Sequence, residues 1–261
     1  QTARASDADA QRAKTHGGLN RTFHDPAEGD AAFELLGDIL GHQLGVDFRL
    51  ADFHDVQMHL IGGELLDAGA GVGALFAAYV ETMVSGKHRP LSIHVVAYEN
   101  DQKILPYLKE TINRCEATCR RAGISFQGEI REDDFIAAAI TQSEEGLFTV
   151  HGEPFTHAIL NPPYKKISGE STTRRLLDAA GFEVSNLYAA FVWLSAKLLM
   201  PGGELAAITP RSFCNGPYFR RFRIDLLKMM SLRRIHVFES RNKAFRDDDV
   251  LQENVIYHMV R

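Results

Sequence analysis

Short apolar segments of strand length alternate with longer segments of helical periodicity, and this alternation is the strongest constraint on the fold of the 261-residue chain. Parallel strands need crossover connections, usually helices, so the order predicts a mainly parallel sheet covered on both faces. Only a loop separates the last two strand-like segments, which predicts an antiparallel final strand. We therefore expect an α/β, Rossmann-like, doubly wound sheet. The strand-like segments are ELLDAG (64–69), SIHVVAYE (92–99), ISFQGEI (124–130), HAILN (157–161), ELAAITP (204–210), RRIHVF (233–238) and VIYHMV (255–260).

The amino-terminal part of the chain differs in composition from the rest. Residues 1–30 are polar and rich in Ala, Asp, Arg and Gly, so we expect an N-terminal arm there. AAFELLGDILGHQLG (31–45) then has apolar residues at helical spacing and predicts the first helix. Residues 31–261 are expected to form one domain, because a 45% hydrophobic content supports a substantial core.

Composition excludes several classes of protein. The apolar runs are shorter than the roughly 18 residues of a membrane-spanning helix, and the amino terminus lacks an apolar signal core, so we expect a soluble, cytoplasmic protein without a membrane partner. Cys115, Cys119 and Cys214 are too few for a disulfide framework and lack zinc-site spacing, so no metal is expected. A net charge of -5 argues against a polyanion footprint over the whole surface but leaves local basic clusters open.

A glycine-rich turn, LLDAGAGVG, follows the first predicted strand. Asp67, Ala68, Gly69 and Gly71 lie where a strand turns into a helix, and glycines there let a ligand approach the main chain. The Gly-x-Gly-x-Gly spacing differs from the Gly-x-Gly-x-x-Gly of dinucleotide sites, and Asp67 would repel a diphosphate. An acid beside the loop favours a cofactor with a cationic, amino-acid-like end, such as S-adenosylmethionine.

Acidic residues also follow the second and third predicted strands. Glu99, followed by Asn100, lies where a doubly wound sheet presents an acid to ribose hydroxyls. After the third strand, Asp134 can accept a hydrogen bond from the amino group of adenine, and Phe135 can form a flat apolar wall. Asp133 is an equally placed alternative acceptor. Together with the glycine loop, these residues predict a nucleoside-containing cofactor.

The fourth predicted strand ends in Asn161, Pro162, Pro163 and Tyr164. Two prolines exclude both a helix and an interior strand, so the tetrapeptide must be a stiff turn that presents one amide and one aromatic ring. Such a turn suits a planar, polar ligand.

The four features LLDAGAGVG, Glu99, DDF and NPPY together resemble the amino-methylating, S-adenosylmethionine-dependent methyltransferases. The resemblance covers residues 60–261 and is closest to the DNA adenine-N6 methyltransferases of restriction-modification systems in their gamma arrangement. It implies the class I methyltransferase fold. It also implies that Asp67, Gly69 and Gly71 hold the methionine end of the cofactor, Glu99 its ribose, and Asp134 with Phe135 its adenine.

The resemblance assigns catalysis to the Asn161–Tyr164 tetrapeptide. An exocyclic amine is a poor nucleophile, because its lone pair is delocalised into the ring. The Asn161 side-chain oxygen and the Pro162 carbonyl would accept its two N–H bonds and aim the lone pair at the methyl group, with Pro163 stiffening the turn. Tyr164 would stack on the base after it leaves the duplex.

The resemblance further implies contacts to double-stranded DNA. Phe245, an exposed aromatic in a predicted loop, is the favoured second wall for the flipped base, since Phe238 ends an apolar strand. Lys165, Lys166, Arg241 and Lys243 are expected to contact phosphates. In the gamma arrangement a target-recognition region follows the catalytic domain, and we expect it to be absent here. A separate specificity region or a cognate restriction endonuclease is then a candidate partner.

Three other functions share these features. Protein glutamine-N5 methyltransferases use the same tetrapeptide to orient a planar amide, and RNA amino-methyltransferases act on similar amines. A non-catalytic DNA-binding subunit would keep the fold alone, although the intact tetrapeptide argues against it. The predicted function is methyl transfer to the N6 amino group of a flipped-out adenine in DNA.

Overall fold

The computed structural model describes residues 63–86, 89–144, 154–237 and 254–261, which form one sheet with helices on both faces. Within these residues the strand order is β3-β2-β1-β4-β5-β7-β6. Strands β1 to β5 run parallel, whereas β7 is antiparallel to both β5 and β6. The predicted doubly wound sheet with an antiparallel final strand is therefore confirmed. The predicted arm (1–30), the helix at 31–45 and Phe238 lie outside the described residues.

The strands match the predicted apolar segments to within two residues, except at the start of β5. The strands are β1 (Gly63–Ala68), β2 (Ser92–Tyr98), β3 (Ser125–Arg131), β4 (Phe155–Leu160), β5 (Leu199–Pro210), β6 (Ser231–Val237) and β7 (Asn254–Val260). The segment ELAAITP predicted that β5 begins at Glu204. The structure starts it at Leu199, which pairs with Phe155, and a register shift between Phe155 and His157 accommodates the irregular stretch.

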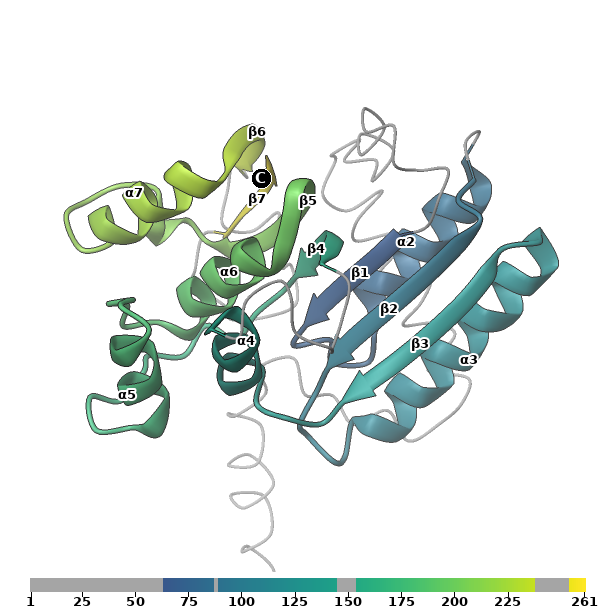
Figure 1. The fold of residues 1–261 in the computed structure, drawn as a ribbon, viewed down its shortest axis with the longest axis horizontal. Helices are drawn as coiled ribbons and strands as arrows, with labels where there is room; N and C mark the ends of the chain where they lie inside the picture. Colours follow the sequence, from purple (N-terminus) through teal and green to yellow (C-terminus); the bar gives the residue numbers. More distant parts are fainter. Residues whose placement is uncertain (1–62, 87–88, 145–153, 238–253) are drawn as a thin grey trace, which may run out of the picture.

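The helices cover the two faces of the sheet in separate groups. The helices are α2 (Ala74–Ser85), α3 (Leu105–Ala122), α4 (Phe135–Glu144), α5 (Thr172–Ala179), α6 (Leu187–Leu198) and α7 (Arg220–Met229), with a 3-10 turn, η5 (Arg211–Phe213). Figure 1 shows α2 and α3 beside β1, β2 and β3, and α5, α6 and α7 at the other side of the molecule. Among the described residues, no helix is long and apolar enough to span a membrane.

Alternate residues of the central strands belong to two different hydrophobic clusters. Leu65 of β1 packs with α2 and α3, whereas its neighbour Leu66 packs with α4 and α6. This is the period of two expected for a strand covered on both faces. Every residue of β4 is buried, as expected for the centre of a parallel sheet. The carboxyl ends of β1, β2 and β4 are therefore fixed by packing on both sides.

Helix α5 was missed by the sequence analysis. It has only eight residues, too few to show a clear helical period. The Ser171 side chain caps it by accepting a hydrogen bond from the Arg174 backbone N–H at 3.1 Å, and Leu177 anchors it in the core. The serine before the helix was the one local signal, and it is weak in isolation. The segment after β4 is thus an ordered part of the fold.

Two glycines with left-handed backbones allow a matched test of packing. At Gly73, with φ of 85°, an added Cβ would lie 2.4 Å from Phe76 and 2.9 Å from Leu108. At Gly123, with φ of 75°, an added Cβ meets nothing within 4 Å. We expect Gly123→Ala to lower the free energy of unfolding by about 1–2 kcal/mol through backbone strain. Gly73→Ala should lower it by about 1–3 kcal/mol more through overpacking. Urea denaturation measures both, and equal losses would show that the contacts at Gly73 do not matter.

Candidate active site

The loops after β1, β2 and β4 meet at the carboxyl edge of the sheet because of the strand register. Asp67 is level with Ala97 of β2 and with Ile159 of β4. Two residues after these aligned positions, the three chain segments leave the sheet side by side. The residues at this point are Gly69, Glu99 and Asn161. The register brings together a residue from each of the three predicted motifs.

Main-chain hydrogen bonds fix the glycine loop across the end of β2. The backbone N–H groups of Gly69 and Ala70 both donate to the Tyr98 carbonyl, at 3.0 and 2.9 Å. Gly69 and Gly71 have φ values of 78° and 58°, which favour glycine. An added Cβ at Gly69 would lie 3.5 Å from Phe191 and 3.9 Å from Pro163. The glycine loop therefore lies against both the Asn161–Tyr164 turn and helix α6.

The Glu99 carboxylate is held by two backbone amides. Its Oε2 accepts from the Gly71 N–H at 3.0 Å and its Oε1 from the Asp101 N–H at 2.8 Å. The side chain is half-buried, while Asn100 beside it is exposed. Each carboxylate oxygen keeps an acceptor position for a further donor. Glu99 is thus fixed beside the glycine loop, in the position predicted for an acid that binds ribose hydroxyls.

Asp67 is a fully buried carboxylic acid at the end of β1. Neither of its oxygens makes a hydrogen bond of ordinary length and angle within the described residues, and the backbone N–H of Phe76 offers only a weak interaction. Burial, with a smaller contribution from the negative charge of Glu99, raises the pKa of Asp67 to about 7, although the Phe76 backbone acts in the opposite direction. The neighbouring Ala68 is also buried. Buried polar groups are normally paired, so Asp67 marks a place where a donor is needed.

The residues after β3 begin helix α4. Asp134 caps the helix, since its Oδ1 accepts from the Ala137 N–H at 2.9 Å, and both Asp133 and Asp134 are exposed. Phe135 is only 4% exposed and packs against Tyr98 and Phe191, with ring centroids 5.1 and 5.0 Å apart. The cap engages one oxygen of Asp134, and Asp133 remains an open alternative for contact with adenine.

The Asn161–Tyr164 turn carries an internal hydrogen bond. The Tyr164 hydroxyl donates to Asn161 Oδ1 at 3.1 Å, with the Ile208 carbonyl as a more distant acceptor at 3.5 Å. Burial raises the pKa of Tyr164, so its hydroxyl stays protonated and remains a donor. Pro162 is buried whereas Asn161 and Pro163 are exposed. The turn therefore presents an oriented amide oxygen at the surface.

Two antiparallel hydrogen bonds fix the segment that follows the turn. The Leu187 N–H donates to the Lys165 carbonyl at 2.9 Å, and the Ile167 N–H donates to the Ser185 carbonyl at 2.7 Å. The side chains of Lys165 and Lys166 are exposed beside the site. The other predicted substrate contacts, Arg241, Lys243 and Phe245, lie outside the described residues.

The site contains a residue that sequence reasoning did not single out, Phe191 of α6. It contacts Phe135, and it is the nearest side chain to the Cβ position of Gly69. In the sequence it is one of many apolar residues in a helical pattern, so no local signal marks it. Within the described residues, no group of three or more His, Cys, Asp or Glu side chains is placed to hold a metal ion.

The residues at this edge fit S-adenosylmethionine. Asp67 makes no hydrogen bond of ordinary geometry, and its carboxyl group has the chemistry to accept one from a cationic ammonium group. Gly71 has open space beside its main chain, and Glu99 keeps acceptor positions next to it. The sheet order together with these residues defines a class I S-adenosylmethionine-dependent methyltransferase.

The chain belongs to the Eco57I restriction-modification methylase family, whose sequence pattern it matches over residues 87–245. It is 48% identical over 199 residues to the type II methyltransferase M.BsuBI of Bacillus subtilis, covering 76% of this chain and 38% of that protein. It is 46% identical over 237 residues to the type II methyltransferase M.PstI of Providencia stuartii, covering 89% of this chain and 46% of that protein. The chain thus spans less than half the length of these relatives.

A solved structure agrees with the fold. A class I S-adenosylmethionine-dependent methyltransferase from Listeria monocytogenes superposes with a TM-score of 0.55, covering 94% of this chain and 63% of that chain at 13% identity. At this identity the similarity shows the fold alone. Family and fold together confirm S-adenosylmethionine as the cofactor.

The raised pKa of Asp67 predicts how stability depends on pH. In the unfolded chain this carboxyl titrates near about 3.9, whereas in the folded chain its pKa is about 7. Between these values the folded state binds a proton that the unfolded state has lost. Protonation of Asp67 therefore contributes fully to the free energy of unfolding below about pH 4, and this contribution is lost as pH rises through about 7.

Asp67→Asn removes this titration while it keeps the side-chain shape. From pH 5 to pH 8, wild type should lose about 2–3 kcal/mol of unfolding free energy relative to the variant. All other titrating groups are common to both proteins, so the difference isolates Asp67. Urea denaturation at the two pH values measures it, and parallel pH dependences would show that Asp67 is ionised at pH 5.

Proposed function

We propose that the chain is the catalytic part of a DNA methyltransferase that transfers a methyl group from S-adenosylmethionine to the N6 amino group of a flipped-out adenine. The observation that carries the proposal is the oriented amide oxygen of Asn161, which leaves the sheet level with Gly69 of the cofactor loop. A polar acceptor next to the cofactor loop is what an amine needs to attack an electrophilic methyl group.

The cofactor side of the site would be formed by residues of three loops. Bound S-adenosylmethionine supplies a sulfonium-activated methyl group. Asp67 would meet its ammonium group, Glu99 its ribose hydroxyls, and Asp134 or Asp133 the amino group of its adenine. Glycine at 69 and 71 keeps the approach open. The remaining cofactor residues of this proposal are Ala68, Asn100 and Phe135.

On the substrate side, the turn orients the amine. Asn161 Oδ1 and the Pro162 carbonyl would accept the two N–H bonds of the adenine amino group, which favours a pyramidal nitrogen with its lone pair free. The Tyr164 hydroxyl already fixes Asn161 Oδ1, so the acceptor needs little reorganisation. The Tyr164 ring would hold the flipped base by stacking, and Phe245 would form its second wall.

DNA is the substrate that the family and the local charge support best. The relatives are type II methyltransferases of a restriction-modification family. Lys165 and Lys166 lie exposed next to the catalytic turn, and we assign them, with Arg241 and Lys243, to phosphate contacts. A target-recognition region or a cognate endonuclease would supply sequence specificity.

Transfer of an isotopically labelled methyl group tests the function. The chain is incubated with labelled S-adenosylmethionine and with DNA, RNA or a glutamine-containing protein in parallel, and the products are digested and analysed. We expect label only in N6-methyladenine from DNA. Label in N4-methylcytosine, in RNA or in glutamine would replace the proposal with one of those activities.

Asn161→Ala tests the acceptor role. The variant should lower kcat by roughly a hundredfold or more, because the lost interaction is made most strongly in the transition state. Cofactor affinity, measured by calorimetry, should stay close to wild type, since Asn161 acts on the amine. A variant with normal kcat would show that the turn has only a structural role.

Tyr164 substitutions separate its two roles. Tyr164→Phe removes the hydrogen bond to Asn161 and keeps the ring, so kcat should fall by about fivefold, the value of one hydrogen bond of about 1 kcal/mol. Tyr164→Ala should also raise KM for DNA, because stacking of a base is worth about 1–3 kcal/mol. Tyr107→Phe on α3 is the matched control. If Tyr164→Phe and Tyr164→Ala had the same kcat and the same KM for DNA, the Tyr164 ring would not stack on the base.

A further inference from the structure

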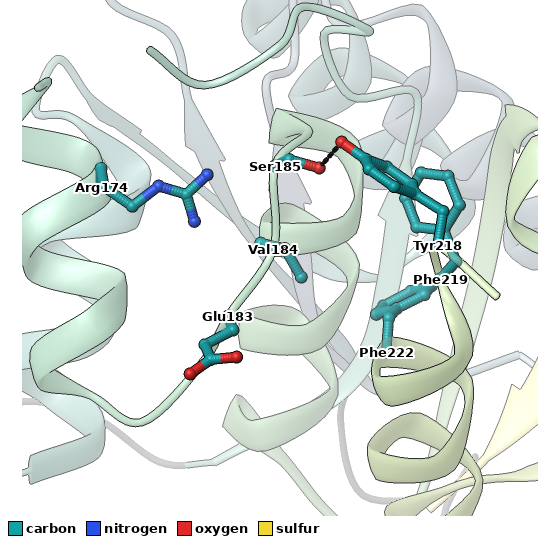
Figure 2. Close-up of a pocket in the computed structure, with 7 residues that line it drawn as sticks. All are labelled: Arg174, Glu183, Val184, Ser185, Tyr218, Phe219 and Phe222. Carbon is teal, nitrogen blue, oxygen red and sulfur yellow. Dashed lines mark hydrogen bonds between the residues drawn. The ribbon is translucent and has the colours of Figure 1, made fainter. Parts of the chain in front are cut away.

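A cavity of about 240 Å³ is lined by seven residues outside the Asn161–Tyr164 turn (Figure 2). It is formed by α5, by the segment that precedes α6 and by the start of α7. Val184, Phe219 and Phe222 supply apolar lining, while Arg174 and Glu183 supply one charge of each sign. The volume is below the roughly 300–1,000 Å³ of sites for drug-sized molecules and suits a single ring system.

Tyr218 gives this cavity a fixed aromatic surface. Its side chain is 64% exposed, yet its hydroxyl is hydrogen-bonded to the Ser185 hydroxyl. The ring also packs edge-on against Phe219, with centroids 4.8 Å apart and an interplanar angle of 83°. Figure 2 shows the Tyr218 hydroxyl directed at Ser185. An exposed ring whose orientation is already fixed loses little entropy when a flat ligand stacks on it.

The loop that carries Tyr218 is itself clamped by α7. The Arg223 guanidinium donates to three carbonyls of this loop, those of Phe213 at 2.9 Å, Asn215 at 3.0 Å and Gly216 at 2.7 Å. These bonds order the chain immediately before Tyr218. The aromatic surface is therefore part of the fixed structure around the cavity.

The charge around the cavity favours an anionic ligand. Arg174 approaches Asp178 only to 3.7 Å, which leaves most of its five N–H donors available. The whole chain has a net charge of -5, but the segments after β4 and β5, residues 161–186 and 211–229, have an excess of cations even though Arg221 is paired with Asp225. Their acids are Glu170, Asp178, Glu183 and Asp225, against the cations Lys165, Lys166, Arg174, Arg175, Arg211, Arg220, Arg221, Arg223 and Lys228.

A row of aromatic rings connects the cavity to the catalytic turn. Tyr164 contacts Tyr188 with centroids 6.3 Å apart, and Tyr188 contacts Phe219 at 5.6 Å. The backbone adds a second link. Ile167 lies three residues after Tyr164, and its N–H donates to the carbonyl of Ser185, which lines the cavity. The cavity is therefore packed against the same part of the core as the Asn161–Tyr164 turn.

We propose that this cavity is a second base-binding site, which takes an unstacked nucleobase near the target on the same DNA strand. The base stacks on Tyr218 and a neighbouring phosphate pairs with Arg174. Glu183 accepts a hydrogen bond from an exocyclic amino group, which favours adenine, cytosine or guanine over thymine. This inference rests on the proposed function, because its ligand is the DNA substrate.

Binding of short, fluorescently labelled single-stranded DNA tests the second site. The chain is saturated with S-adenosylhomocysteine, and fluorescence anisotropy gives the affinity of wild type and variants. Tyr218→Ala and Arg174→Gln should each weaken binding about tenfold, the range expected for loss of a stacked base or a phosphate contact. Tyr218→Phe keeps the ring but loses the hydrogen bond to Ser185, so its affinity should lie between those of wild type and Tyr218→Ala. An oligonucleotide made of thymine alone should bind more weakly than mixed sequences.

Two control variants make the same substitutions, Tyr to Ala and Arg to Gln, on helix α3. Tyr107→Ala removes an exposed tyrosine of α3, and Arg120→Gln removes an arginine of an i,i+4 ion pair on the same helix. Both should leave DNA affinity unchanged, and S-adenosylhomocysteine affinity should be unchanged in every variant, which shows that the fold is intact.

The possible failures are distinguishable. If wild type binds DNA and transfers methyl groups but Tyr218→Ala and Arg174→Gln bind DNA equally well, the second site is wrong while the proposed function stands. If wild type neither binds DNA nor methylates it, both are wrong.

Discussion

The hydrogen bonds from the Gly69 and Ala70 N–H groups to the Tyr98 carbonyl are the constraint on which the site depends. They turn the loop after β1 across the end of β2, which is possible because Gly69 adopts a positive φ. The next residue of β2, Glu99, then meets the Gly71 N–H. Two strand ends and one loop thereby become a single rigid unit. The parallel register with β4 places Asn161 beside this unit, so sheet pairing sets the distance between cofactor loop and catalytic turn.

Asp67 shows that this arrangement has an energetic cost in the absence of a ligand. Its carboxyl group is fully buried, and within the described residues it makes no hydrogen bond of ordinary length and angle. Burial of an unpaired polar group destabilises a protein by about 1–3 kcal/mol, and here part of that cost appears as a raised pKa. A cationic ligand that meets Asp67 would recover this energy on binding. The group that costs stability is thus also a source of cofactor affinity, as expected of a functional site.

The sheet and most of the site could be predicted from the sequence because they depend on local patterns. The glycine loop, Glu99 and the Asn161–Tyr164 turn each follow an apolar strand, and parallel strand ends meet at one edge. Other features depend on contacts distant in sequence. Helix α5 is held by one cap and one buried leucine, the early start of β5 follows its pairing with β4, and Phe191 reaches the site only because α6 packs over β1. The cavity at Tyr218 likewise forms where loops after two different strands meet.

A crystal structure of the chain with S-adenosylhomocysteine tests the central claim most directly, namely that the glycine loop, Glu99 and the Asn161–Tyr164 turn form one methyl-transfer site. The account predicts that the ribose hydroxyls donate to Glu99, that the amino-acid end lies at Asp67, and that the sulfur faces the side chain of Asn161. A ligand bound away from the glycine loop, or one whose sulfur faces away from Asn161, would contradict it.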